Sequence, residues 1–432
     1  MSNAVYGGYG PRPRPPGGSL VRGVAESIPM IALAAFSDLD RGLREPFFGL
    51  TTDGRLREGL FSLSTDEVKT APMVQAARRY LELLPADRRP RASLPFDHLE
   101  RRRWTNAFPA WEPGGLRLED LAEDARAAAM DLVAATLSAK GFADVRKVMR
   151  LNGVLGEIIG DDYDGTLREW IYWLTIFGEP DREAPWGWQI MGHHLDLNCF
   201  FLGDQMVITP MFMGTEINHY EGADGERIDA FQAESETALE LIGSLSRTQQ
   251  DKAVLHRSML SKDLPPALIH PTEGRHHGGA GQDNLILPYE GIGADALTPG
   301  QREGLLDLVD VYIGRAAEGH RAARMAEIKR HLDETHFAWI GSPDGDTPFY
   351  YKVHNPVVLI EFDHHSGVFL DNDEPERFHV HSIVRTPNAG DYGMDLLRMH
   401  YERFHSHDEE QGHSHHGHTH SHPHSHPHTQ ED

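Results

Sequence analysis

Two histidines near the end of the chain stand two residues apart in a β-prone run, residues 378–385. Because residues two apart on a strand point to the same side, His379 and His381 share a face with Arg385. Two imidazoles side by side on a rigid strand suit a metal site, and the arginine adds a group that can bind an anion. An exposed pair of strand histidines without a ligand is the competing interpretation.

The β-prone run before it, residues 349–363, ends in acids. Glu361 and Asp363 share one strand face with His365. Burying the Glu361 carboxylate in this apolar run costs free energy unless a metal, a histidine or an arginine compensates its charge. We therefore expect Glu361 to be a metal ligand or, like Asp363, a general base, while Arg385 holds a substrate carboxylate or stabilises developing negative charge.

A third group of candidates lies in residues 192–198, Gly-His-His-Leu-Asp-Leu-Asn. On a strand, His194 would share a face with Asp196, and His193 would face the apolar side. A bulge at Gly192 would turn both imidazoles to one side. His194 is the better ligand, and His193 is either a ligand or a hydrogen-bonded core histidine. Together with His379 and His381, these strands would supply three or four ligands and leave one position open, as catalytic metal sites do.

Two chemistries fit such a site, and the sequence does not separate them. In a hydrolase, the ion lowers the pKa of a bound water to about 7, and the substrate is a small anionic or carboxylate-bearing molecule. In an oxidoreductase or oxygenase, iron or copper occupies the same ligands, and two histidines with one carboxylate suit iron. We favour the hydrolase, with a divalent ion of Zn, Fe, Cu, Ni or Co.

The last part of the chain alternates histidine with serine, glycine, threonine and proline. This composition cannot bury a core, so the tail is expected to be flexible and to lack the fixed ligand geometry of a catalytic ion. It is expected to collect transition-metal ions, which makes a metal storage or delivery protein the third alternative. The tail histidines expected to capture metal are His413, His415, His416, His418, His420, His422, His424, His426 and His428.

Other histidines carry weaker signals. His219, His276 and His277 lie in loop-like sequence, and we expect them at the surface. The chain contains no GxSxG, HExxH, phosphate-loop or dinucleotide-binding motif that would point to another chemistry.

The elements that must position these side chains occur in blocks. Apolar residues at helical spacing predict helices, and short β-prone runs predict strand pairs, without a regular alternation between the two. This order favours an α+β fold, a single large domain of antiparallel strand pairs packed with helices. Ser246 and Thr298 are expected N-caps. The predicted helical segments are 72–84, 116–137, 143–159, 231–255 and 299–332, and the predicted strand segments are 170–213, 349–363 and 378–385.

Composition divides the chain into three regions. Residues 1–25 form an arm rich in glycine, proline and arginine that is expected to be disordered, residues 26–404 read as globular, and residues 405–432 are the histidine-rich tail. With 41 basic and 66 acidic side chains the formal charge is -25, which disfavours nucleic acid and anionic membranes as partners.

The expected partners are a small-molecule substrate and metal ions. The only cysteine, Cys199, rules out a disulfide framework or a thiolate cluster. No stretch approaches the roughly 20 apolar residues that span a bilayer, and we expect a cytoplasmic location.

Several separated motifs resemble one known family. They are Pro185-Trp186-Gly187-Trp188, Gly192-His193-His194-Leu195, Tyr350-Tyr351 with Ile360-Glu361, and His379-Val380-His381-Ser382 with Arg385, Pro387 and Asp391-Tyr392-Gly393. In this order they resemble the family called domain of unknown function 3500, whose start is similar to residues 49–61. The family often has Arg-Asp-Pro where this chain has Arg385-Thr386-Pro387. The resemblance covers residues 47–401 and implies one continuous domain that contains the same histidines, without an activity to carry over.

Overall fold

The structure is a computed structural model of the whole chain. It describes residues 39–63, 68–109, 111–160, 165–223, 225–270 and 273–404. The expected N-terminal arm and the histidine-rich tail lie outside the described residues.

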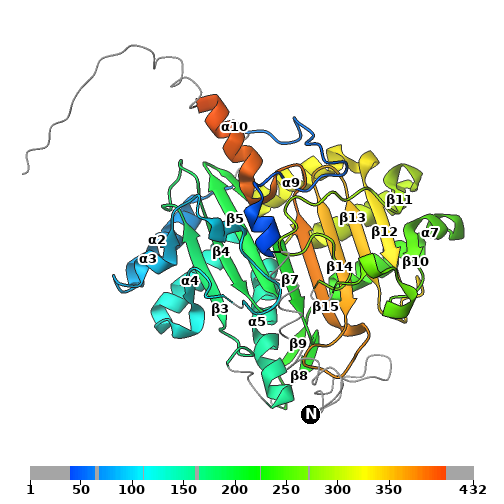
Figure 1. Cartoon of the computed structure of the whole chain (residues 1–432), viewed down its shortest axis with the longest axis horizontal. Coiled ribbons are helices and arrows are strands. Elements are labelled where there is room, and N and C mark those ends of the chain that lie inside the picture. Colours follow the sequence, from blue (N-terminus) through cyan, green and yellow to red (C-terminus); the bar gives the residue numbers. More distant parts are fainter. Residues whose placement is uncertain are drawn as a thin grey trace, which may run out of the picture.

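A mixed sheet of thirteen strands forms the centre of the fold (Figure 1). The strand order is β1-β3-β4-β5-β7-β15-β14-β13-β12-β10, with β2, β6 and β11 paired at the side of this path and β8 with β9 as a separate hairpin. All neighbours along the path are antiparallel except β1 with β3 and β10 with β12. The strands are β1 (Ser93–Leu94), β2 (Leu116–Arg117), β3 (Tyr172–Phe177), β4 (Trp186–Gly192), β5 (Leu195–Leu202), β6 (Gln205–Val207), β7 (Met211–Thr215), β8 (His219–Glu221), β9 (Arg227–Asp229), β10 (Val254–His256), β11 (Ile292–Gly293), β12 (His336–Ile340), β13 (Tyr350–His354), β14 (Leu359–His365) and β15 (Glu376–Arg385).

Seven helices lie in segments that the apolar periodicity predicts, and their boundaries are set by local signals, whereas α3 and α10 were not predicted. Ser138 caps α5 by accepting a hydrogen bond from the Gly141 amide, and Gly160 ends the helix in the left-handed region at φ 71°. Ser246 and Thr298 both form complete capping boxes, as expected. The helices are α2 (Ala71–Leu83), α3 (Arg89–Ala92), α4 (Glu123–Thr136), α5 (Ala139–Ile159), α6 (Gln232–Ser244), α7 (Arg247–Ala253), α8 (Pro299–Ile313), α9 (Glu318–Arg330) and α10 (Met394–Phe404).

Three predicted helical segments differ from the structure. The segment that begins at Leu116 first pairs with β3 and becomes helical only at Glu123, because its first residues complete the sheet edge. The segment 231–255 divides into α6 and α7, since Ser246 starts a new helix, and the segment 299–332 divides into α8 and α9 around Gly314. The α+β class is confirmed.

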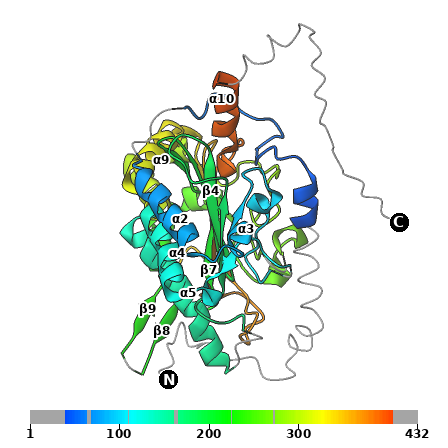
Figure 2. The ribbon, with the colours of Figure 1, turned by 90° about the vertical axis from the view of Figure 1, so that its left-hand side faces the viewer.

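The two faces of the sheet differ in character. Along β14, Ile360 and Phe362 point into the large apolar core that includes residues of α2, α4, α5, α6, α8 and α9. Seen edge-on, helices α2, α4, α5 and α9 cover this side of the sheet (Figure 2). Glu361 and Asp363, which alternate with these two residues along the strand, point to the opposite face and are fully buried there.

That second face is covered mainly by loops, with a short helix of residues 39–44 packed on them (Figure 2). The loop of residues 273–293 lies across it, because the Arg275 amide binds the Asp363 carboxylate and the Gly278 amide binds that of Glu361. Small apolar clusters complete the cover, such as Trp104, Phe212 and Ile383.

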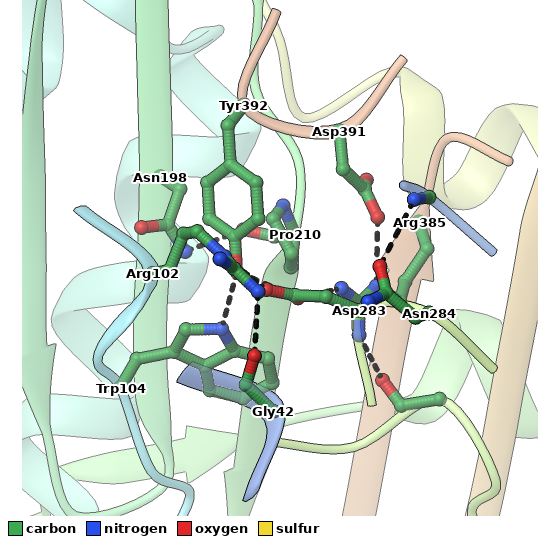
Figure 3. Close-up of polar contacts among 12 residues, drawn as sticks. Gly42, Arg102, Trp104, Asn198, Pro210, Asp283, Asn284, Arg385, Asp391 and Tyr392 are labelled. Carbon is green, nitrogen blue, oxygen red and sulfur yellow. Dashed lines mark hydrogen bonds and ion pairs between the residues drawn. The ribbon is translucent and has the colours of Figure 1, made fainter. Parts of the chain in front are cut away.

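Asp283 joins this loop to three other parts of the chain (Figure 3). Its Oδ1 accepts hydrogen bonds from Arg385 Nη2 at 2.5 Å and from the Tyr392 hydroxyl at 3.1 Å, and its Oδ2 accepts one from Arg102 Nε at 2.8 Å. Arg102 also donates to the Gly42 carbonyl. Because the carboxylate and the Arg385 guanidinium are both buried, their opposite charges balance each other in the protein interior.

Replacing Asp283 by alanine leaves the Arg385 guanidinium short of a counter-charge in the interior. We expect a loss of about 3 to 5 kcal/mol in the free energy of unfolding, measured by urea denaturation. Asp333→Ala is the matched control, because Asp333 is an exposed partner of Arg302, and its loss is expected within about 0.5 kcal/mol. Equal losses in the two variants would contradict the role given to Asp283.

Candidate metal centre

His379 and His381 lie on β15 at the middle of the sheet. The strand pairs with β14 on one side, where Asp363 is opposite His381, and with β7 on the other, where Gly214 is opposite His381. A Cβ atom at Gly214 would lie 3.2 Å from the His381 ring, so glycine leaves the space that the imidazole occupies. The two histidines point away from the helices, as the alternation of the sequence predicts.

His193 and His194 form a turn, whereas the sequence pattern predicts them on a strand. Gly192 pairs with Leu195, so the two histidines are the two-residue loop of the hairpin between β4 and β5. His194 has φ 58°, the left-handed region, and its backbone is held by hydrogen bonds to Asn106 and Gly214. The turn places the two imidazoles in a stack, with ring centroids 3.9 Å apart.

The turn brings His194 against the histidines of β15. One nitrogen from each of His194, His379 and His381 lies within 4.8 Å of the others, and all three residues are buried. The Nε2 atoms of His379 and His381 are 3.1 Å apart. Two nitrogens that bind one tetrahedral ion at 2.0 to 2.1 Å lie about 3.3 Å apart. The His379–His381 pair is close to this spacing, and the His194 nitrogen lies within 4.8 Å of both, so the three histidines form a group that could hold a metal ion.

The ring nitrogens of this group are short of hydrogen-bond partners. Among the described residues, neither nitrogen of His194 has a partner, and neither does Nδ1 of His381. Burial lowers the pKa of His194, His379 and His381 well below the usual value, so the imidazoles are neutral at pH 7. Buried polar atoms left without partners are rare in proteins, and a neutral imidazole is the form that binds a metal.

His365 is a fourth histidine at the centre that the sequence interpretation did not include among the ligands. Its ring centroid lies 4.9 Å from that of His379 and 4.5 Å from that of His381. Nδ1 donates to the Ser366 carbonyl at 2.7 Å, which leaves the Nε2 lone pair available. Nε2 has no partner among the described residues. The sequence contains a signal that could have identified His365, because the same strand alternation that groups Glu361 with Asp363 also includes His365.

Asp363 and His276 lie beside the three histidines. Asp363 Oδ1 is 3.9 Å from His381 Nδ1 and 3.4 Å from His276 Nε2, and burial raises the pKa of this carboxyl well above its usual range. The expectation that His276 is a surface residue was wrong, because the loop that covers the sheet buries it, and burial lowers its pKa to about 4. His277 keeps a half-buried side chain, 3.3 Å from Glu361.

Glu361, an expected ligand or general base, holds the covering loop. Its Oε2 accepts from the Gly278 amide at 2.7 Å, and its Oε1 accepts from the His277 amide at 3.0 Å and the Tyr350 hydroxyl at 2.7 Å. Although burial opposes ionisation, the bonds and charges of His277 hold the pKa of Glu361 far below its usual value. Its role in catalysis or metal binding stays a prediction, and the observed bonds favour a role in positioning the loop.

Arg385 and His193 also have partners of their own. Besides Asp283, the Arg385 guanidinium binds Asp391 at 2.8 Å and the Gly278 carbonyl at 3.0 Å, so its expected contact with substrate stays a prediction. His193 Nδ1 is 2.8 Å from Asn152 Oδ1. Because the Asn152 amide nitrogen donates to two carbonyls, its oxygen faces the imidazole as an acceptor. The His193 ring also stacks on His194, and its role as a metal ligand stays a prediction.

The remaining expectations concern the tail, the cysteine and the membrane. The tail histidines lie outside the described residues. Cys199 is buried on β5 without a disulfide. Among the helices of the described residues, none has the length and apolar character to cross a bilayer.

The fold and the site define an α+β protein with a buried histidine group suited to a metal ion. The chain matches the family model described as a protein of unknown function (DUF3500) over residues 66–394. Since this match covers more than half of the 432 residues, the chain belongs to that family, as its motifs predict. Comparison with curated proteins and with solved structures found no match. The chemistry of the site must therefore be argued from its own geometry.

Replacing His381 by asparagine removes one of the three clustered nitrogens. In full-length protein whose tail histidines are all changed to asparagine, we expect the metal content to fall from about one ion per chain to a small fraction of that, measured by elemental analysis. His364→Asn is the matched control, because His364 is buried on β14, the strand that pairs with β15, and its ring packs against Phe349 and Phe362 of the large apolar core. Equal metal contents in the two variants would contradict the assignment.

His354, on β13, gives a pH dependence that is separate from the centre. Neither ring nitrogen has a partner among the described residues, and burial lowers its pKa to about 3. In the unfolded chain the His354 imidazole is protonated below about pH 6.5, whereas in the folded chain it stays neutral. The free energy of unfolding is therefore highest above pH 6.5 and decreases as the pH is lowered below that value.

We expect His354→Gln to reduce the loss of stability between pH 7 and pH 5 by about 2 kcal/mol, measured by urea denaturation at both values. The same change at the exposed His98 serves as the control. A pH dependence that is the same in both variants would show that His354 is protonated in the folded protein.

Proposed function

We propose that this protein is a metal-dependent enzyme in which His194, His379 and His381 bind one divalent transition-metal ion. The observation that carries the proposal is the close approach of three buried, neutral imidazoles, within 4.8 Å of one another. They are contributed by the β4–β5 turn and by β15, which β7 joins in the sheet. His365, through its free Nε2 lone pair, is available as a further ligand.

The reaction class that we propose is hydrolysis. Three histidine ligands with an open position are a catalytic arrangement, and an ion held in this way lowers the pKa of a bound water to about 7. Asp363 is the proposed proton acceptor, because its Oδ1 faces His381 and His276 and has no hydrogen-bond partner among the described residues. Its other oxygen accepts the Arg275 amide at 2.8 Å, which holds the carboxylate in one orientation.

An iron or copper oxidoreductase is the second candidate. The observation that favours it is the position of Asp363 opposite His381, because two histidines and one carboxylate form a common iron site. Metal storage by the tail remains an alternative for residues outside the described part. A centre on a buried strand face supports an ion that stays in place, whereas a delivery protein must release its ion.

The substrate class that we propose is a small anionic or carboxylate-bearing molecule. The formal charge of -25 disfavours nucleic acid and anionic membranes as partners. A cytoplasmic location stays a prediction from the sequence.

The activity test uses full-length protein whose tail histidines are changed to asparagine, loaded with Zn²⁺. We expect hydrolysis of small esters and amides, with p-nitrophenyl acetate as the first probe. The rate should fall on the order of 10²-fold in Asp363→Asn, because the proton acceptor is lost while the shape is kept. His331→Asn is expected to stay within about twofold, since His331 lies at the end of α9, one of the helices that cover the other face of the sheet.

Two results would contradict the hydrolase. One is a rate that is equal in Asp363→Asn and in the control. The other is a protein that is inactive with Zn²⁺ but consumes oxygen with Fe²⁺, which would establish the oxidoreductase instead.

A further inference from the structure

A pocket of about 90 Å³ adjoins the metal centre. His365 belongs to both, because its ring lies against His379 and His381 and also lines the pocket. The wall includes Arg275, Gly274 and Ser366. Because a water molecule in the liquid takes about 30 Å³, this volume suits a ligand of about three to six non-hydrogen atoms.

Arg275 differs from the other buried arginines of the described residues. Arg315 binds Glu234 at 2.6 Å, Arg385 binds Asp283 at 2.5 Å, and Arg324 binds Glu327. Arg275 is also buried, yet its Nη2 donates only to a neutral carbonyl, that of Met259, at 2.7 Å. Its Nε has no hydrogen-bond partner among the described residues.

A buried guanidinium with an unused donor is costly, and an anion is the partner that would satisfy it. The two carboxylates that act on Arg275 through space are Asp363 and Glu374. Asp363 accepts the backbone amide of Arg275, and Glu374 accepts the amide of Ser261. Neither therefore serves as a direct ion-pair partner for the side chain.

Gly274 explains how the arginine comes so close to the centre. The residue has φ 66°, and a Cβ atom there would lie 2.3 Å from Asp363 Oδ2 and 2.5 Å from the His365 ring. Only glycine permits this approach of the backbone. The next residue, Arg275, is thereby attached to Asp363 through its amide, and its side chain lines the pocket.

We propose that this pocket binds the carboxylate of a small substrate, with the Arg275 guanidinium as the anion-binding group and His365 at the side that faces the metal ion. The inference deepens the proposed function and rests on it, because it names the group that the substrate presents. The sequence favours Arg385 for the anion-binding role, but Arg385 already forms ion pairs with two aspartates. We assign this role instead to Arg275, which has no ion-pair partner among the described residues.

The test uses Co²⁺ bound to full-length protein whose tail histidines are changed to asparagine, with acetate as the probe. Cobalt content is measured first, and the visible spectrum of Co²⁺ is then followed as acetate is added. We expect saturable binding of acetate that weakens on the order of 10- to 100-fold in Arg275→Met, since a hydrogen-bonded charge is lost. Arg275→Lys, which keeps the charge, should bind with intermediate affinity, and it replaces the methionine variant if that one does not fold.

Two controls separate the pocket from general anion binding. Arg377→Met removes an arginine that binds the Gly345 carbonyl elsewhere, and its affinity for acetate is expected to be unchanged. Benzoate, with nine non-hydrogen atoms, should bind at least about tenfold more weakly than acetate, because it exceeds the volume of the pocket.

The possible results are distinguishable. A protein without bound cobalt overturns the proposed function and this inference with it. Cobalt at about one ion per chain, with acetate binding that is absent or equal in wild type, Arg275→Met and Arg275→Lys, overturns the anion pocket alone. Benzoate that binds as tightly as acetate overturns the proposed size of the substrate.

Discussion

The burial of uncharged imidazoles on one face of the sheet is the constraint on which the rest of this structure depends. Among the described residues, several ring nitrogens of His194, His379 and His381 are buried without a hydrogen-bond partner, which costs free energy unless something else binds their lone pairs. The fold tolerates the cost because the opposite face of the same strands buries a large apolar core against the helices. One face thus stabilises the fold, and the other holds the candidate metal centre.

Two acids on neighbouring positions of one strand face have different surroundings. Glu361 is surrounded by donors, namely two backbone amides and the Tyr350 hydroxyl, and these bonds favour its ionised form. Asp363 has one amide donor on one oxygen, and its other oxygen faces the histidines. Glu361 therefore holds the covering loop, whereas Asp363 lies beside the candidate metal centre. Strand alternation alone does not distinguish these two positions.

Local patterns predicted a large part of the fold and of the site. Period-two alternation identified His379 and His381 together with Asp363, and helical periodicity located α2 and α5 to within a few residues, whereas the start of α4 was placed seven residues too early. The β4–β5 turn was missed because His193-His194 lacks the Asn-Gly type of sequence that marks a two-residue hairpin loop. The burial of His276 and the different partners of Arg275 and Arg385 were not predictable. They depend on how residues 273–293 lie across the sheet, which contacts distant in sequence decide.

The order of strands in the sheet has a consequence for assembly. β7 and β15 are neighbours although Met213 and its partner Ser382 are 169 positions apart in the sequence, and the proposed ligands come from either side of this junction. A metal ion bound there would therefore cross-link two parts of the chain that are far apart in the sequence. Because these three histidines come together only in the folded chain, an ion bound by them would favour the native state.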